Sequence, residues 1–165
     1  PILCSNCLEG KISKLPFTSA TCKPVHPFDI AHSDVWGPAP CLSIDGFKYY
    51  VIFMDQCTRF CWIFPLVNKA NVCSTFTTFY QFILNHFSVS IKTLQRDGGG
   101  EFVSNQLQTF LATKGISHQL SCPYTLEQNG LAERKHRHII ETTITLLQTF
   151  HLPTPFWSFA CQTSV

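Results

Sequence analysis

The chain has 165 residues, of which 45% are hydrophobic and only 13% are charged. This is enough apolar material for the core of one domain, so an intrinsically disordered protein is excluded. The formal net charge of +2 is too small to indicate a nucleic-acid partner by itself, so any basic surface must be local. No segment approaches the roughly 18 apolar residues of a membrane span and no signal peptide is apparent, which predicts a soluble intracellular protein without a membrane partner.

Residues 1–27 are predicted to form an extended connector. Within it, Cys4 and Cys7 form a C-x2-C pair, the spacing with which structural zinc sites supply two of their ligands. No second pair follows at a matching spacing, so the partners precede Pro1 or the two thiols are unrelated. Cys22 or His26 as substitute ligands are a third, less favoured alternative. The nine cysteines are an odd number scattered through apolar runs, which does not indicate a disulfide framework.

From Phe28 onward, apolar runs and helical periodicities predict a mixed α/β domain. The expected strands cover residues 28–38, 48–55, 59–66, 91–97 and 116–121. The expected helices cover residues 70–87, a segment capped by Ser104 and ended by Gly115, and residues 131–149. Three strands followed by alternating helices and strands indicate a five-stranded sheet with helices on its faces. The chain stops at Val165 within a helical pattern, so we expect a piece of a longer polypeptide.

Two aspartates fall at strand ends in this scheme. Asp97 ends the fourth strand and precedes three glycines, which let the backbone turn without crowding the carboxylate. Asp34 is expected at the end of the first strand. Two neighbouring carboxylates are costly unless something positive neutralises them, so the pattern favours a divalent metal.

The third acid, Glu133, lies on the first turns of the long helix. At about 100° per residue, Ile140, Ile144 and Leu147 fall within about 40° of it, which predicts that Glu133 faces the sheet. The other side of the helix carries basic residues that could contact phosphates, namely Arg134, Lys135 and His138. Three carboxylates suit Mg²⁺ or Mn²⁺, and two such ions about 4 Å apart support phosphoryl displacement.

Each of these residues also has a purely structural interpretation. Asp97 alone could be an ordinary Asp-Gly turn residue, and Glu133 could exist only to pair with Arg137 one turn later. Asp55 is expected to be a structural turn acid or an outer-sphere partner. His32 and His118 lie in strand patterns and are expected to be hydrogen-bonded histidines, not metal ligands.

The chain resembles the integrase region of copia-type LTR retrotransposons across nearly its whole length. The resemblance rests on "HSDVWGP", "DGGGEF", "SCPYT", "QNGLAERKHRH" and "LPTPFW", which occur in the order and spacing of that family. It implies an RNase H-like fold and a catalytic Asp, Asp, Glu triad with 35 residues between the last two members. That interval separates Asp97 from Glu133, so the metal-binding and catalytic roles transfer to Asp34, Asp97 and Glu133.

The resemblance also implies partners and a domain division. Similar enzymes trim retroelement cDNA ends and join them to target DNA in Mg²⁺-assisted reactions, with Gln128 and Asn129 in a loop that approaches the DNA. Residues 1–27 would be the end of a truncated His-His-Cys-Cys module that binds Zn²⁺ in the full-length protein, and residues 28–165 a catalytic core truncated at its C-terminus. A homo-oligomer acting in the nucleus, or present in a cytoplasmic particle, is expected.

Two other functions stay open from the sequence. A decayed or domesticated fragment could bind nucleic acid or a protein partner without turnover. An RNase H-type nuclease would share the fold but cleave RNA–DNA hybrids, and the "QNGLAERKHRH" helix argues against it.

The sequence departs from the family at Leu126-Glu127, where members usually have Pro-Gln. Loss of the proline frees the loop, and Glu127 brings a negative charge towards a phosphate backbone, so strand transfer should be weakened. Restoring the pair with Leu126→Pro and Glu127→Gln in a complete protein should therefore raise the strand-transfer rate. An unchanged rate on labelled DNA ends would show that the departure has no effect.

Overall fold

The computed structural model describes residues 24–96, 104–120 and 130–165, and it contains the mixed five-stranded sheet predicted from the sequence. The strands are β1 (Ile30–Trp36), β2 (Tyr49–Asp55), β3 (Cys61–Leu66), β4 (Thr93–Arg96) and β5 (Ser117–Leu120). The helices are η1 (Lys69–Asn71), α2 (Val72–Phe87), α3 (Asn105–Lys114), α4 (Gly130–Thr149), η3 (Thr154–Phe156) and α5 (Trp157–Thr163). Among the helices of these ranges, none is long and apolar enough to cross a membrane.

The strand order is β3-β2-β1-β4-β5. β2 pairs antiparallel with both β1 and β3, as expected for consecutive strands joined by short connections. β1 pairs parallel with β4, and β4 with β5, through connections that contain helices. β1 is therefore the central strand, with an antiparallel neighbour on one side and a parallel neighbour on the other.

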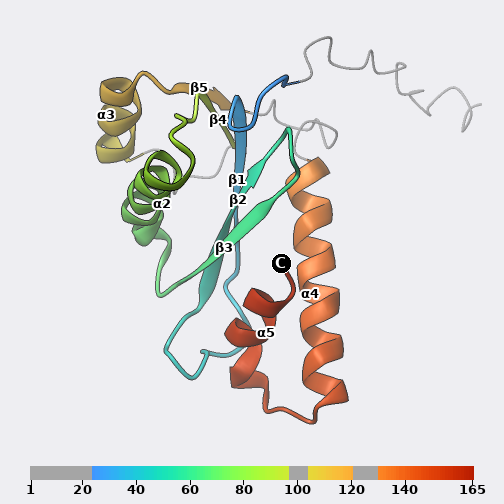
Figure 1. Ribbon diagram of the computed structural model, residues 1–165. Helices are drawn as coiled ribbons and strands as arrows, with labels where there is room; N and C mark the ends of the chain where they lie inside the picture. Colours follow the sequence, from blue (N-terminus) through green and yellow to red (C-terminus); the bar gives the residue numbers. More distant parts are fainter. Residues whose placement is uncertain (1–23, 97–103, 121–129) are drawn as a thin grey trace, which may run out of the picture.

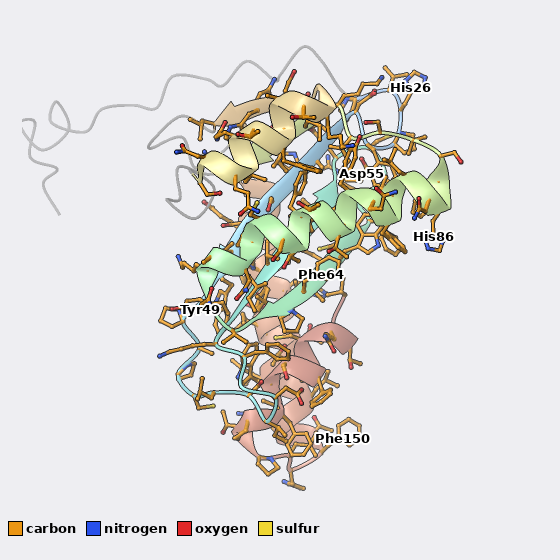
Figure 2. The ribbon with its side chains drawn as sticks, turned by 90° about the vertical axis from the view of Figure 1, so that its left-hand side faces the viewer. His26, Tyr49, Asp55, Phe64, His86 and Phe150 are labelled. Carbon is orange, nitrogen blue, oxygen red and sulfur yellow. The ribbon has the colours of Figure 1, made fainter. Side chains whose placement is uncertain are left out.

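Helices cover both faces of the sheet (Figure 1). On one face, Val51 and Phe53 of β2 pack with the apolar side of α2, and Phe64 of β3 lies beneath that helix (Figure 2). On the other face, alternate β2 residues pack against α4 and α5, beginning with Tyr50 and Ile52. The alternation of a strand thus divides the core into two clusters, one for each helical layer.

The helix ends follow the expected capping chemistry. Ser104 caps α3, because its hydroxyl accepts a hydrogen bond from the backbone N–H of Leu107. Gly115 ends the same helix in the left-handed conformation, with φ of 66°. Leu107 and Leu111 are buried and Phe110 packs against the same cluster, which confirms the stripe predicted for this helix.

The parallel register between β1 and β4 positions the residues of interest. Ser33 pairs with Arg96, the last residue of β4, so Asp34 is the first residue of β1 beyond this pairing. Asp34 instead lies opposite Ile52 of β2. It is two residues inside β1 and not at the end of the strand as the sequence had suggested, because β1 continues to Trp36 along β2.

Gly37 ends β1 where the backbone approaches β2 closely. Its φ is +126°, and an added Cβ would lie 2.6 Å from Cδ1 of Tyr49 and 2.9 Å from the carbonyl oxygen of Lys48. Gly46 also has a positive φ, +81°, but an added Cβ there would meet nothing within 4 Å. A side chain at Gly46 would therefore carry only the cost of its backbone conformation. A side chain at Gly37 would carry that cost and a steric clash as well.

We expect Gly37→Ala to destabilise the domain more than Gly46→Ala. The backbone penalty at Gly46 should be about 1 kcal/mol. At Gly37 the clash adds to a similar penalty, so the total should exceed about 3 kcal/mol. Urea unfolding of the two variants measures the difference, and equal free energies of unfolding would show that the chain turns at Gly37 without steric constraint.

Candidate active site

Asp34 lies on the face of the sheet that α4 covers. Its side chain is 14% exposed, and one carboxylate oxygen accepts a hydrogen bond of 2.8 Å from the backbone N–H of Val35. The other oxygen lies 3.4 Å from Nε2 of His136 on α4. Asp34 is therefore a half-buried acid in direct contact with the helix that carries Glu133.

His136 is buried between Asp34 and Tyr50. The residue is 9% exposed, and its Nδ1 lies 3.0 Å from the hydroxyl oxygen of Tyr50, a fully buried residue near the start of β2. Burial raises the pKa of Tyr50, so its hydroxyl keeps its proton and is able to donate. His136 stands among basic residues in the sequence, and no local pattern there indicates this contact.

The prediction that Glu133 faces the sheet is wrong. Glu133 is exposed, and α4 packs on the sheet through Ala132, His136 and Ile139. The buried Thr143 lies against α5, where its hydroxyl is 3.2 Å from Sγ of Cys161. The stripe of Ile140, Ile144 and Leu147 instead borders a cavity of about 160 Å³ that Trp36 and Trp157 also line. A second helix, α5, packs beside α4, so the most apolar stripe is shared between α5 and the segment after β1.

Glu133 nevertheless lies on the flank of α4 that faces β1. Helical geometry places it about 90° from the centre of the buried stripe, on the same side as Ile140, which shares a cavity wall with Trp36 of β1. Lys135 lies on the opposite flank, near Cys61 of β3. Glu133 therefore belongs to the edge of α4 that runs along the strand carrying Asp34.

Glu133 is not held by an ion pair on its own helix. Within the described ranges the ion pairs are Asp29 with His26 and with Lys92, and Asp34 with His136. The interpretation of Glu133 as a structural partner of Arg137 is therefore not supported.

The exposure of the basic residues agrees in part with the prediction. Arg134 and His138 are exposed, whereas Lys135 is half-buried. Asp97, Gln128, Asn129, Cys4 and Cys7 lie outside the described residues, as does the Leu126-Glu127 pair. Among the residues that the structure does describe, no three His, Cys, Asp or Glu side chains are grouped closely enough to hold a metal ion.

The residues expected to be structural are hydrogen-bonded as predicted. Asp55 is 1% exposed, and its carboxylate accepts hydrogen bonds from the backbone N–H groups of Phe28 and Thr58 and from the Thr58 hydroxyl. His32 is buried with Nε2 3.2 Å from Oε1 of Gln56. His118 accepts a hydrogen bond from the buried Arg96. These contacts fix the ends of β2, β1 and β4.

His32 and His118 make stability depend on pH. Burial lowers the pKa of both rings below the ordinary value of 6.5, and the nearby Arg96 lowers the pKa of His118 further. Below pH 6.5 the two histidines take up protons in the unfolded chain but not yet in the folded chain. The free energy of unfolding is therefore full above pH 6.5 and falls as the pH drops towards the pKa values of the folded state.

Denaturant unfolding between pH 7 and pH 5 should therefore show a falling free energy of unfolding. The fall should be smaller in His32→Gln, since the amide can still donate to Gln56 but does not titrate. His86→Gln, at an exposed histidine on α2, is the matched control and should leave the slope unchanged. An unaltered slope in His32→Gln would contradict the assignment of a neutral buried ring.

Comparisons with known proteins agree with this geometry. The family described as "Integrase core domain" matches residues 24–125. The retrovirus-related Pol polyprotein from transposon RE1 of Arabidopsis thaliana is 45% identical over 162 residues, which is 98% of this chain but 11% of the relative. The corresponding polyprotein from transposon TNT 1-94 of Nicotiana tabacum is 34% identical over 161 residues, 98% of this chain and 12% of that protein. The chain thus spans about a tenth of these relatives.

Solved structures show the same architecture. The HTLV-2 integrase catalytic core domain, in complex with magnesium and in a trimeric form, superposes with a TM-score of 0.61 at 20% identity, covering 85% of this chain and 84% of that one. A simian T-cell lymphotropic virus intasome, in complex with a PP2A regulatory subunit, gives a TM-score of 0.71 at 15% identity, covering 97% of this chain and 56% of that one. The fold is therefore RNase H-like, as the resemblance had implied.

Proposed function

Because the chain belongs to the integrase core domain family and matches the copia-type Pol polyproteins, we propose that it is a catalytic core that processes retroelement cDNA ends and joins them to target DNA. The observation that carries this proposal is the 3.4 Å contact between Asp34 and His136, because it places the first turns of α4 against β1. Glu133 lies one turn before His136, on the flank of α4 that faces β1. Two of the three acids thus belong to elements that are in contact.

The third acid is expected beside the first. Asp97 directly follows Arg96 in the chain, and Arg96 pairs with Ser33, which directly precedes Asp34. Asp34 and Asp97 are therefore each the next residue in the sequence after a paired position of two adjacent parallel strands. Brief continuation of the same register would set their Cα atoms about 4.8 Å apart.

The donor set suits a hard divalent cation. Three carboxylates, from Asp34, Asp97 and Glu133, would supply oxygen ligands to Mg²⁺ or Mn²⁺, and the Asp34 side chain is still partly accessible. When bound, such ions activate the attacking oxygen and stabilise the leaving oxygen of a phosphodiester. The magnesium in the HTLV-2 core supports this choice. Zn²⁺ bound through Cys4 and Cys7 remains a proposal for the longer protein.

The exposed basic residues of α4 are the proposed contacts for DNA. Arg134 and His138 lie away from the sheet, where they could reach phosphate oxygens, and Gln128 and Asn129 precede the helix. Lys135 lies on the flank near β3, so its contribution should be smaller. Joining two cDNA ends to target DNA would require more than one copy of the catalytic core, so we propose a homo-oligomer. Its proposed location is the nucleus or a cytoplasmic particle.

Replacement of the acids by their amides in a complete integrase containing this chain tests the proposal. Asp34→Asn, Asp97→Asn and Glu133→Gln should each lower metal-dependent strand transfer on labelled DNA ends by at least about 100-fold, because several kcal/mol of charge stabilisation are lost. Glu141→Gln removes an exposed carboxylate two turns further along α4 and should leave the rate unchanged.

Other results would favour other functions. DNA binding without metal-dependent joining or cleavage by the unaltered protein would identify a non-catalytic binding fragment. Cleavage of RNA–DNA hybrids in place of DNA joining would identify an RNase H-type nuclease. Full activity of Glu133→Gln would remove Glu133 from the triad.

A further inference from the structure

The apolar cluster beneath α4 contains a row of three polar side chains, namely Tyr50, His136 and Asp34. Tyr50 and His136 are both buried among residues such as Ile52 and Ile139, and the Asp34 side chain, which is 14% exposed, lies beside His136. Nε2 of His136 is buried without a hydrogen-bond partner among the described residues, although the Asp34 carboxylate is 3.4 Å away. A buried ring nitrogen is costly to leave unpaired, so this atom points to an interaction that the site requires.

The two contacts determine which ring nitrogen carries the proton. An ionised carboxylate only accepts hydrogen bonds, so Nε2 must carry the hydrogen to interact favourably with Asp34. Nδ1 lies 3.0 Å from the Tyr50 hydroxyl, which can donate to it when the ring hydrogen is on Nε2. Burial keeps that hydroxyl protonated by raising the pKa of Tyr50. Hydrogen atoms are therefore donated in one direction along this row, from Tyr50 to His136 and from His136 towards Asp34.

We propose that His136 is a positioning residue, which orients the Asp34 carboxylate for metal binding and fixes the register of α4 against β1. This inference rests on the proposed function, since it assigns Asp34 the role of a metal ligand. The 3.4 Å separation is longer than a formed hydrogen bond, and contacts of this kind commonly shorten when ligand binds. Hydrogen-bond partners of ligating carboxylates strongly affect metal affinity.

The same contact relates two of the three acids. His136 follows Glu133 by three residues, or about 4.5 Å along the helix axis. A shift of α4 that separates His136 from Asp34 would therefore move Glu133 by the same amount. Small residues on the same stripe, such as Ala132, permit close approach but do not select one register, whereas a directional polar contact does.

Two amide substitutions separate the roles of the two ring nitrogens. In His136→Gln the amide nitrogen takes the place of Nε2 and can still donate to Asp34, whereas in His136→Asn it takes the place of Nδ1 and cannot reach. We expect the Mn²⁺ affinity of the full chain, measured by electron paramagnetic resonance of the free ion, to fall about 10-fold in His136→Asn and less than about 3-fold in His136→Gln. Tyr50→Phe should also weaken binding, and the exposed-site control His86→Gln should not.

Circular dichroism and unfolding curves of each variant establish that it is folded. If His136→Asn does not fold, the comparison of Tyr50→Phe with His86→Gln decides the question, since Tyr50→Phe removes a single oxygen. Equal Mn²⁺ affinity in folded His136→Asn, His136→Gln and the unaltered chain would overturn the proposal. Absence of Mn²⁺ binding in the unaltered chain would instead count against the proposed function.

A second measurement decides the role of His136 independently of metal binding. Nitrogen-15 resonances of the ring should show a hydrogen on Nε2, and the Nε2 resonance should move in Asp34→Asn. A hydrogen on Nδ1, or an Nε2 resonance that does not respond to Asp34→Asn, would overturn the proposal.

Discussion

The packing of α4 against β1 and β2 is the constraint on which the geometry of the site depends. The helix approaches the sheet through Ala132 and Ile139, and between them His136 lies within contact distance of both Asp34 and Tyr50. Apolar packing alone allows neighbouring registers of similar energy, because it has no direction. The His136 ring adds a direction to this packing, because another register would break its 3.0 Å contact with the Tyr50 hydroxyl and move Nε2 away from the Asp34 carboxylate.

Much of the fold follows from the sequence. The five strands, the order of the helices, the cap at Ser104 and the end at Gly115 agree with the structure to within a few residues. These features depend on local chemistry, because alternation, helical periodicity and capping act over a few positions. The structural roles of Asp55 and His32 were also predictable from their places in strand patterns.

The face of α4 was not predictable in the same way. Ile140, Ile144 and Leu147 form its most apolar stripe, yet the sheet receives the stripe of Ala132, His136 and Ile139. The presence of α5 explains the difference, because a helix with two neighbours must divide its surface between them. The periodicity of one helix does not show which of its faces packs on the sheet and which packs on the adjacent helix. Ala132, His136 and Ile139 do have helical spacing, but a small and a polar residue among them make this face look less apolar than the other.

The acids illustrate the same limit. Asp34 and Glu133 were identified from spacing and from resemblance, and the structure places them on contacting elements, although Glu133 is exposed on the flank of α4 and does not point into the sheet. The proposed role of Glu133 as a metal ligand therefore requires its carboxylate to extend from this flank of α4 towards Asp34. The contact between His136 and Asp34 is a tertiary one between residues about a hundred positions apart, and no local pattern encodes it.

A crystal structure of the full chain with Mn²⁺, in which anomalous scattering locates the ion, decides whether the three acids form one metal site. We expect an anomalous peak bound by the carboxylate of Asp34 together with those of Asp97 and Glu133, at the edge of α4 that faces β1. A peak elsewhere, or an ion held by Asp34 with Glu133 directed away from it, would show that they do not.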